Sequence, residues 1–373
     1  MSARQTVIVA LSGGVDSAVA ALLMRNQGYD VQCLHMTNWE DDGYCDNARE
    51  FQDAKRICEQ LELPLHRVNF ADEYRQSVFS HFLDELRLGR TQNPDVLCNR
   101  EIKFGVLRRY AKRLGGDILA TGHYARIANT ADRPQLLKGK DQNKDQSYFL
   151  HHVHCDDFRD VAFPLGDYLK DEVRALAKEA NLWVADKKDS TGICFIGERP
   201  FTEFLSQYLP NQPGPIVTVQ EQAIGTHCGL AFYTLGQRHG LEIGGLQEYE
   251  QAPWYVAEKR VEDNALIVVQ GKHHAKLYCD FLRASEPHWL VDPLRLAGSQ
   301  GTFKCAAKTR YRQPDQTCEV SLTGTAGLEV VFDQPQRAVT PGQYVVFYDA
   351  DRCLGGAIIE ATEFRSACAV SAA

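Results

Sequence analysis

Two patterns of apolar residues alternate along roughly the first 200 positions of the chain. Short runs rich in β-branched residues predict strands at residues 6–11, 29–36, 65–70 and 117–121. Between these runs, apolar residues recur every three or four positions, which predicts helices at residues 16–27, 47–61, 71–88 and 102–114, and a further helix at 167–180. Because strands that alternate with helices are typical of βαβ units, we predict an α/β domain with a parallel sheet over residues 1–207.

The pattern changes at residues 208–215, where the sequence YLPNQPGP interrupts any helix and indicates a domain boundary. Beyond it, short strand-like runs at 216–219, 254–257 and 266–269 predict a small, mostly β central domain over residues 208–280. The last part is entirely strand-like, with runs at 302–311, 318–322, 328–332 and 344–348. A small barrel or sandwich fits this pattern, and we predict a β-barrel over residues 281–362 followed by a tail at 363–373.

Composition narrows the class of protein. A chain of 373 residues with 44% hydrophobic and 24% charged residues is typical of a soluble protein with more than one core. The apolar run at residues 7–11 is too short for a signal segment or a membrane span, so we expect a cytoplasmic protein with no membrane partner. A formal net charge of -8 argues against binding nucleic acid by bulk electrostatics, and any RNA contact must use local patches.

The segment at residues 7–17 places an apolar strand, a Ser-Gly-Gly turn and a helix start in succession. Gly13 and Gly14 would allow a positive φ and a close approach to an anion, while Ser12 and Ser17 add hydroxyl groups. The helix N-terminus adds its dipole. The segment therefore predicts a phosphate-binding loop.

Asp16 lies within this loop and would repel a phosphate unless a metal ion bridged them, so it suggests Mg²⁺. The loop lacks the lysine of the GK[ST] motif and does not match GxGxxG. It resembles instead the PP-loop, SGGxDS, of the ATP pyrophosphatases, enzymes that leave the α-phosphate on an acceptor oxygen and release pyrophosphate.

The chain has twelve cysteines, but it has no CxxC pair and no export signal, so we expect reduced thiols that mostly act as small buried hydrophobic residues. Cys98 differs because it precedes the helix predicted at 102–114, with Asn99 as a plausible N-cap. The helix dipole, Arg100 and Lys103 would stabilise its thiolate. On this evidence a reactive thiolate and a buried structural cysteine are equally open.

Cys194 lies between Gly192 and Gly197, after Lys187 and Lys188. A flexible loop flanked by cations suits a sulfur carrier, which a donor protein must reach and load as a persulfide. The sequence also contains HHVHC at residues 151–155, but residues this close do not converge on one ion without a sharp turn. We therefore predict a surface segment there and assign no metal site.

Several further motifs, considered together, resemble one family, the bacterial tRNA-specific 2-thiouridylases of the PP-loop ATP pyrophosphatase superfamily. The resemblance covers residues 7 to about 360 and rests on SGGVDS at 12–17, MTNW at 36–39, NPD at 93–95 with Cys98, GHY at 122–124, KDQSYF at 144–149, DSTGICFIG at 189–197, LGQR at 235–238 and KTRYR at 308–312. It implies that the α/β domain is Rossmann-like and that the cofactors are ATP and Mg²⁺. The positions implied to bind ATP are Ala10, Leu11, Ser12, Gly13, Gly14, Val15, Asp16, Ser17, Met36 and Gly122.

The resemblance also implies catalytic and tRNA-binding residues. Cys98 would be the nucleophile and Cys194 the persulfide carrier, and Asp95 is the best general acid or base, although an Asx turn after Pro94 explains it equally well. The positions implied to contact tRNA are Asn93, Pro94, Asp95, His123, Lys144, Asp145, Gln146, Arg310, Tyr311 and Gln343. Arg310 to Arg312 combine guanidinium groups with a stacking ring, as RNA contacts do, but alternating residues of a strand are more often a solvated face.

The implied reaction adenylates O2 of the wobble uridine, which must leave the anticodon stack, and replaces it with sulfur. The products would be 2-thiouridine, AMP and pyrophosphate, with a Cys98–Cys194 disulfide left for a reductant. The implied partners are tRNAs for Lys, Glu and Gln and a persulfide donor, either a relay protein or a cysteine desulfurase. Two alternatives stay open: a PP-loop ligase that transfers nitrogen, and a nucleotide-binding redox sensor in which the cysteines form a switch.

Overall fold

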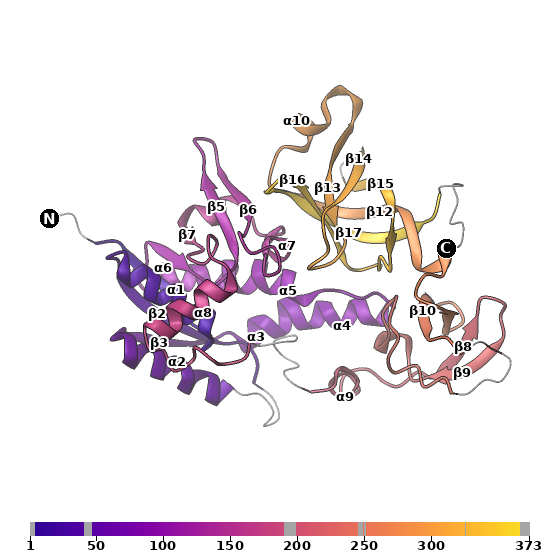
Figure 1. The fold of residues 1–373 in the computed structure, drawn as a ribbon, viewed down its shortest axis with the longest axis horizontal. Coiled ribbons are helices and arrows are strands. Elements are labelled where there is room, and N and C mark those ends of the chain that lie inside the picture. The colour runs from indigo at the N-terminus through magenta and orange to yellow at the C-terminus, as the bar shows by residue number, and fades with distance from the viewer. Residues whose placement is uncertain are drawn as a thin grey trace.

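The computed structural model describes residues 4–40, 47–189, 199–244, 249, 251–324 and 326–365. Figure 1 shows an N-terminal α/β part in indigo to magenta, a barrel in orange and yellow, and a small sheet beside them. Within the described residues, no helix has the length and apolar character needed to cross a bilayer.

The α/β part contains the parallel sheet that the sequence predicts. Its order is β3-β2-β1-β4-β7, and every pairing in it is parallel. The strands are β1 Thr6–Ala10, β2 Asp30–Thr37, β3 Leu65–Asn69, β4 Ile118–Ala120 and β7 Val161–Ala162. One face of β1 and β2 packs against α1 Val15–Asn26, α2 Asn47–Leu61 and α8 Lys170–Glu179. With β1 in the centre, the loop that follows it lies where ligands of such sheets bind.

Two long helical segments lie between β3 and β4 in the chain. The first comprises α3 Ala71–Tyr74, η1 Arg75–Phe79 and α4 Ser80–Arg87, and α4 points toward the small sheet (Figure 1). The second comprises α5 Pro94–Leu97, η2 Cys98–Leu107 and α6 Arg108–Arg113. The prediction that this helix begins at residue 102 is wrong. It begins at Pro94, because Asn93 caps it by accepting the backbone N–H of Asp95 at 3.1 Å and proline suits the first helical position.

The small sheet has the order β10-β11-β8-β9. Its strands are β8 Gly214–Thr218, β9 Ala223–His227, β10 Trp254–Arg260 and β11 Ala265–Gln270. Residues of this sheet, of α9 Phe201–Leu205 and of α4 share one core with Cys98. The small sheet and the helix that carries Cys98 therefore belong to one continuous hydrophobic core.

The C-terminal part is a closed six-stranded antiparallel barrel, which confirms the prediction. Its order is β12-β15-β14-β13-β16-β17, and β12 also pairs with β17. The strands are β12 Tyr278–Trp289, β13 Thr302–Lys308, β14 Gln316–Thr323, β15 Gly327–Arg337, β16 Tyr344–Asp349 and β17 Arg352–Glu363. The remaining short helices of the described residues are α7 Ser147–Leu150, η3 Cys155–Asp160, η4 Leu230–Phe232, η5 Ala275–Leu277, α10 Pro293–Ala297 and η6 Gly298–Gln300.

A hairpin of the α/β part extends the barrel sheet. It consists of β5 Ala125–Asn129 and β6 Pro134–Lys138, and β6 pairs with β17 through Leu137 and Arg352. The backbone N–H of Lys138 also donates to Asp351 O at 2.8 Å. This pairing fixes the barrel against the α/β part.

Candidate active site

The predicted phosphate loop connects β1 to α1. Gly13 has φ +83°, and a Cβ there would lie 2.6 Å from the carbonyl oxygen of Glu50, so only glycine fits. Gly14 has φ -97°, so the expectation of a positive φ is wrong at this position. The Ser12 and Ser17 hydroxyls lie 3.2 Å apart, and the Ser12 backbone N–H donates to Ser17 Oγ at 3.2 Å. The loop is therefore compact, with two hydroxyl groups at the start of α1.

The structure brings Gly122 to this loop. Gly122 follows β4, which pairs with β1, and a Cβ at Gly122 would lie 3.0 Å from the backbone nitrogen of Ser17. Met36 lies near the end of β2, the strand on the other side of β1. Because the carboxyl ends of parallel strands meet at one edge, the predicted ATP-binding positions flank one loop.

Asp16 is neutralised by a lysine that the sequence analysis did not identify. Lys170 Nζ lies 2.7 Å from Asp16 Oδ1 and 2.9 Å from Oδ2, and its side chain is only 9% exposed. The Tyr124 hydroxyl also donates to Asp16 at 2.8 Å, and burial together with the charge of Asp16 raises the pKa of Tyr124. The ammonium group of Lys170 thus bonds to both oxygens of the carboxylate that the sequence predicts as the Mg²⁺ ligand.

Asp189 extends this network toward the second cysteine. It accepts Lys144 at 2.7 Å, Lys170 at 2.8 Å and Arg174 at 2.9 Å. Burial acts to raise the pKa of Asp189, but the hydrogen bonds from Lys144 and Lys170 outweigh it and hold the pKa at about 2. Within the described residues, no group of three or more His, Cys, Asp or Glu side chains is arranged to hold a metal ion.

Lys187 attaches the same segment to the phosphate loop. Its Nζ donates to Gly13 O at 3.1 Å and to Asp53 Oδ2 at 2.6 Å. Residues 187–189 lead directly into residues 190–198, which contain Cys194 and lie outside the described part of the chain. The flank of the predicted persulfide carrier therefore begins at the predicted phosphate loop.

Cys98 is 3% exposed and lies inside a continuous helical segment. The expectation that Asn99 caps the helix after Cys98 is wrong, because Asn93 caps it earlier and Asn99 Nδ2 donates to Asp95 O at 2.9 Å. The effect of a helix N-terminus on charge is confined to the first turn, which precedes Cys98. The helix dipole therefore stabilises a Cys98 thiolate less than the sequence suggested.

The two cations predicted to support that thiolate have other contacts as well. Arg100 Nε donates to Glu101 at 2.6 Å, and Arg100 NH1 lies 3.2 Å from the ring nitrogens of His152. Lys103 Nζ lies 3.4 Å from Nε2 of His123. Arg100 is thus directed toward His152, and Lys103 toward His123.

Asp95 occupies the first turn of the same helical segment. Burial raises its pKa, and the charge of Lys103 offsets part of that effect. The capping side chain is that of Asn93 rather than that of Asp95. A carboxyl whose pKa is raised toward neutrality suits a general acid or base.

Some of the predicted tRNA contacts in the α/β part form hydrogen bonds between two of its loops. Asp145 is buried and accepts the backbone N–H groups of Gly139 at 3.0 Å and Ser147 at 3.1 Å. Gln146 accepts the backbone N–H of Tyr124 at 3.0 Å. His123 is buried as well, and burial, with the charge of Lys103, lowers its pKa well below the ordinary value. In this arrangement Lys144 and Gln146 are the half-buried members of the group.

Arg310 and Tyr311 lie in a turn, so the prediction that they alternate in a strand is wrong. β13 ends at Lys308, because the Gln313 side chain accepts the N–H of Thr309 at 2.7 Å and closes the turn. Arg310 is exposed, while the ring of Tyr311 packs on Phe149 with centroids 4.5 Å apart. The Tyr311 hydroxyl donates to Lys144 O at 3.4 Å, which brings the barrel turn to the 144–146 segment.

Gln343 joins the barrel to the chain just before Asn93. Its Nε2 donates to Thr91 O at 2.6 Å, and the Thr91 N–H donates to Pro341 O at 3.0 Å. The predicted tRNA contacts therefore follow the seam between the α/β part and the barrel.

The prediction of a surface segment at residues 151–155 is wrong for its first part, because His151 and His152 are buried. Their rings stack with centroids 5.5 Å apart, and His152 packs on His288 of the barrel. Burial lowers the pKa of His151 to about 3 and that of His152 to about 2. These side chains are neutral components of the domain interface.

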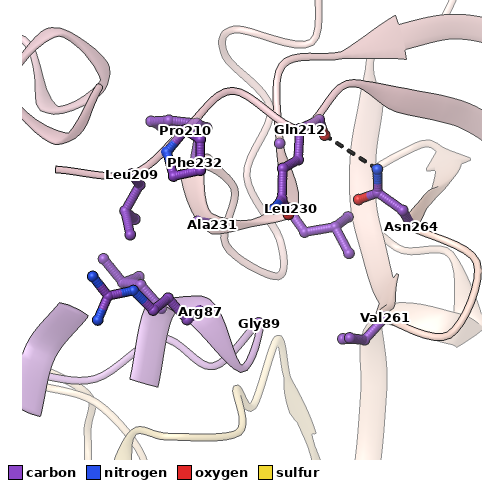
Figure 2. Close-up of a pocket in the computed structure, with 12 residues that line it drawn as sticks. Arg87, Gly89, Leu209, Pro210, Gln212, Leu230, Ala231, Phe232, Val261 and Asn264 are labelled. Atoms are coloured by element: carbon purple, nitrogen blue, oxygen red, sulfur yellow. Dashed lines mark hydrogen bonds between the residues drawn. The ribbon is translucent and has the colours of Figure 1, made fainter. Parts of the chain in front are cut away.

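A cavity of about 470 Å³ lies between the end of α4 and the small sheet (Figure 2). It is lined mainly by apolar side chains such as Leu86, Leu209 and Phe232, and the side-chain amide of Asn264 bonds to Gln212 O beside it at 3.1 Å. It contains no group of titratable side chains of the kind found at the phosphate loop.

Comparison with known proteins identifies the family. Residues 5–198 match the tRNA methyl transferase HUP domain, residues 202–270 the tRNA methyl transferase PRC-barrel domain, and residues 279–359 the aminomethyltransferase beta-barrel domain. The chain is 52% identical over 360 residues to the tRNA-specific 2-thiouridylase MnmA of Hahella chejuensis, covering 96% of this chain and 98% of that protein. It is 55% identical over 359 residues to the MnmA of Methylococcus capsulatus, covering 95% of this chain and 96% of that protein. The chain belongs to the tRNA-specific 2-thiouridylase family.

The similarity to the 2-thiouridylases covers nearly the whole chain. It also extends to the MnmA of Pseudomonas putida strain GB-1, at 54% identity over 364 residues and 97% of this chain. The phosphate loop and the Cys98 helix lie within the residues that match the HUP domain, and the Arg310 turn lies within those that match the beta-barrel domain.

Proposed function

We propose that this chain catalyses the ATP-dependent 2-thiolation of the wobble uridine of tRNA, giving 2-thiouridine, AMP and pyrophosphate. Family membership makes it a tRNA-uridine 2-sulfurtransferase and a nucleotide-binding enzyme of tRNA modification. The observation that carries the proposal is the attachment of residues 187–189 to the phosphate loop through Lys187 and Gly13. It joins the predicted site of adenylation to the flank of the predicted sulfur carrier.

ATP would occupy the loop between β1 and α1. The hydroxyls of Ser12 and Ser17 and the backbone at Gly13 supply the donors and the close approach that phosphates require. Gly122 and Met36 flank the same edge. If Mg²⁺ accompanies ATP, Asp16 would be its carboxylate ligand, and Lys170 would have to give way to it. The bound nucleotide would supply the adenylyl group that turns uracil O2 into a leaving group.

Sulfur would reach the base from a persulfide on Cys194. The Cys98 thiolate would attack the inner sulfur of Cys194, forming a disulfide, while the outer sulfur bonds to C2 of the adenylated uracil and AMP departs with the former O2. A thiol reductant would then reopen the disulfide. Asp95, whose pKa is raised by burial, would exchange the proton at the base.

tRNA would lie along the seam between the α/β part and the barrel. The segment Asn93 to Asp95 would meet the target base, and Lys144 and Arg310 would meet the backbone of the RNA.

We also propose domains over residues 1–207, 208–280 and 281–362 with a tail at 363–373. The barrel, at residues 281–362, would position the RNA. The tRNAs for Lys, Glu and Gln, and a relay protein or a cysteine desulfurase as sulfur donor, complete the proposed set of partners.

Pyrophosphate release distinguishes this function from a redox sensor, and the Cys98→Ser variant distinguishes it from a ligase. With ATP and unmodified tRNA, the enzyme should release pyrophosphate, and omission of tRNA should abolish the release. A redox sensor would release none. A ligase that transfers nitrogen would release pyrophosphate without needing Cys98, so Cys98→Ser would leave its product formation unchanged.

A further inference from the structure

Thr91 lies where three parts of the molecule meet. It precedes Asn93 by two residues, and the barrel holds its backbone through Pro341 and Gln343. A Cβ at Gly342 would lie 2.9 Å from the backbone nitrogen of Thr91, so the barrel turn is pressed against it. The third part is the small sheet, from which Lys259 Nζ reaches the Thr91 hydroxyl at 3.2 Å.

Lys259 differs from the other lysines of this region. It is half-buried on β10, and it takes part in none of the ion pairs formed among the described residues. Its bonded neighbour is a neutral hydroxyl, which does not balance an ammonium charge. Holding such a charge away from water is unfavourable unless an anion joins it.

The charged groups around Lys259 are already compensated by one another. Arg90, beside Thr91, pairs with Glu85 at 3.4 Å and with Glu360 of the barrel. On β10 itself, Glu258 lies 4.0 Å from Lys276, and Arg260 pairs with Glu221 at 2.8 Å. Burial is the cause that lowers the pKa of Lys259, to about 8. No described carboxylate therefore competes with an incoming anion for this ammonium group.

We infer that Lys259 is a phosphate-binding residue of the small sheet, which receives a backbone phosphate of the tRNA next to the target nucleotide. The inference rests on the proposed function and adds the third part of the molecule to the predicted RNA-binding surface. Gln343, a predicted tRNA contact, bonds to the backbone oxygen of the residue whose hydroxyl group bonds to Lys259, so the two side chains meet at Thr91. Lysine binds phosphate as a point charge and tolerates a range of approach directions.

The test compares Lys259→Met, Lys259→Arg and Thr91→Val with a control variant, Lys276→Met. Lys276 is 52% exposed, and its substitution removes the same charge from a different position. Lys259→Met should weaken tRNA binding about tenfold and reduce the salt slope by about one, with ATP affinity unchanged. Lys276→Met and Thr91→Val should stay within about twofold of the wild type. If Lys259 only positions Thr91, Thr91→Val will reproduce the loss, and the inference is wrong.

Measuring tRNA affinity as a function of pH distinguishes an effect of the Lys259 charge from a structural effect of the substitution. Wild-type tRNA affinity should fall as the pH rises from 7 to 9.5, because Lys259 loses its proton, whereas Lys259→Arg should keep its affinity over that range. This comparison stands even if Lys259→Met does not fold. Equal pH profiles for the two proteins, or a joint loss of ATP and tRNA binding in Lys259→Met, would overturn the inference. Absence of 2-thiouridine with the wild type would instead contradict the proposed function.

Discussion

Lys170 Nζ lies 2.7 Å from Asp16 Oδ1, which joins α8 to the first turn of the helix that follows the phosphate loop. The same ammonium lies 2.8 Å from Asp189, in the segment that leads to Cys194. One lysine therefore links the predicted nucleotide site to Asp189, which precedes the predicted sulfur carrier in the sequence.

Removal of this link should weaken nucleotide binding. In Lys170→Met, Asp16 keeps its negative charge beside the phosphate site, so ATP affinity measured without Mg²⁺ should fall on the order of tenfold. The free energy of unfolding should decrease by about 1–3 kcal/mol, because the half-buried Asp16 carboxylate loses its partner. Isothermal titration and denaturant unfolding measure both effects. The control is Lys178→Met on the same helix, whose side chain is 59% exposed; if it behaves like Lys170→Met, the link to Asp16 has no special role.

The two glycines of the loop provide a matched pair. Gly13→Ala should destabilise the loop by about 1–3 kcal/mol and abolish ATP binding, because it forces a left-handed residue against Glu50 O. Gly14→Ala should be tolerated, because its φ is negative and the nearest atom is Ser12 Oγ at 3.5 Å. Nucleotide titration of both variants decides the matter. Equal losses of affinity would mean that the loop geometry differs from the one described.

The sequence predicts the elements near this site better than their ends. Apolar periodicity locates β1 and α1 to within one residue, because a buried strand and an amphipathic helix impose distinct spacings. It misplaces the start of the Cys98 helix, because Asn93 and Asn99 are both good caps and only the tertiary structure selects Asn93. It misses β9 because the strand is mostly exposed.

Contacts between distant segments could not be predicted from the sequence, for a different reason. Nothing in the spacing of the chain relates Lys170 to Asp16, which are separated by 154 residues. The Arg310 turn looked like a strand because the apolar pattern continues past Lys308, while the bond from Thr309 to the Gln313 side chain ends it. His151 and His152 looked exposed because polar residues usually are, whereas the barrel buries them.

The raised pKa of Asp95 should affect both the stability of the protein and its activity. A carboxyl whose pKa is raised in the folded state stabilises the protein below its unfolded pKa and loses that contribution as the pH rises through the folded value. Asp95→Asn should therefore gain stability relative to the wild type at neutral pH, and the difference should shrink at acid pH. Thiolation should fall by about 10²–10⁴-fold. Wild-type turnover in this variant would exclude Asp95 as the acid or base.

Arg310 should contribute to tRNA binding through charge. Arg310→Ala should weaken tRNA binding and reduce the salt slope by about one while ATP affinity stays unchanged, because a lost phosphate contact releases fewer counterions. Filter binding across a salt series is the measurement, with Arg295→Ala on α10, 83% exposed, as the control. A salt slope that matches the wild type would assign Arg310 to the solvated face of the barrel.

The two predicted catalytic cysteines should fail at different steps. Cys194→Ser should still adenylate tRNA but accept no sulfur, because the carrier is lost. Cys98→Ser should accept the persulfide on Cys194 and fail to complete transfer. Intact-protein mass spectrometry after treatment with a heavy-sulfur donor shows where the label resides. Label on Cys98 in Cys194→Ser, with tRNA still thiolated, would reverse the roles.

The central claim is that this chain replaces O2 of the wobble uridine with sulfur at the expense of ATP. The most direct measurement is nucleoside mass spectrometry of unmodified tRNA after incubation with the protein, ATP and a heavy-sulfur persulfide donor. Heavy 2-thiouridine should form only when ATP is present, and it should be absent with Gly13→Ala. Unmodified uridine in the complete reaction, or 2-thiouridine formed equally well without ATP, would contradict it.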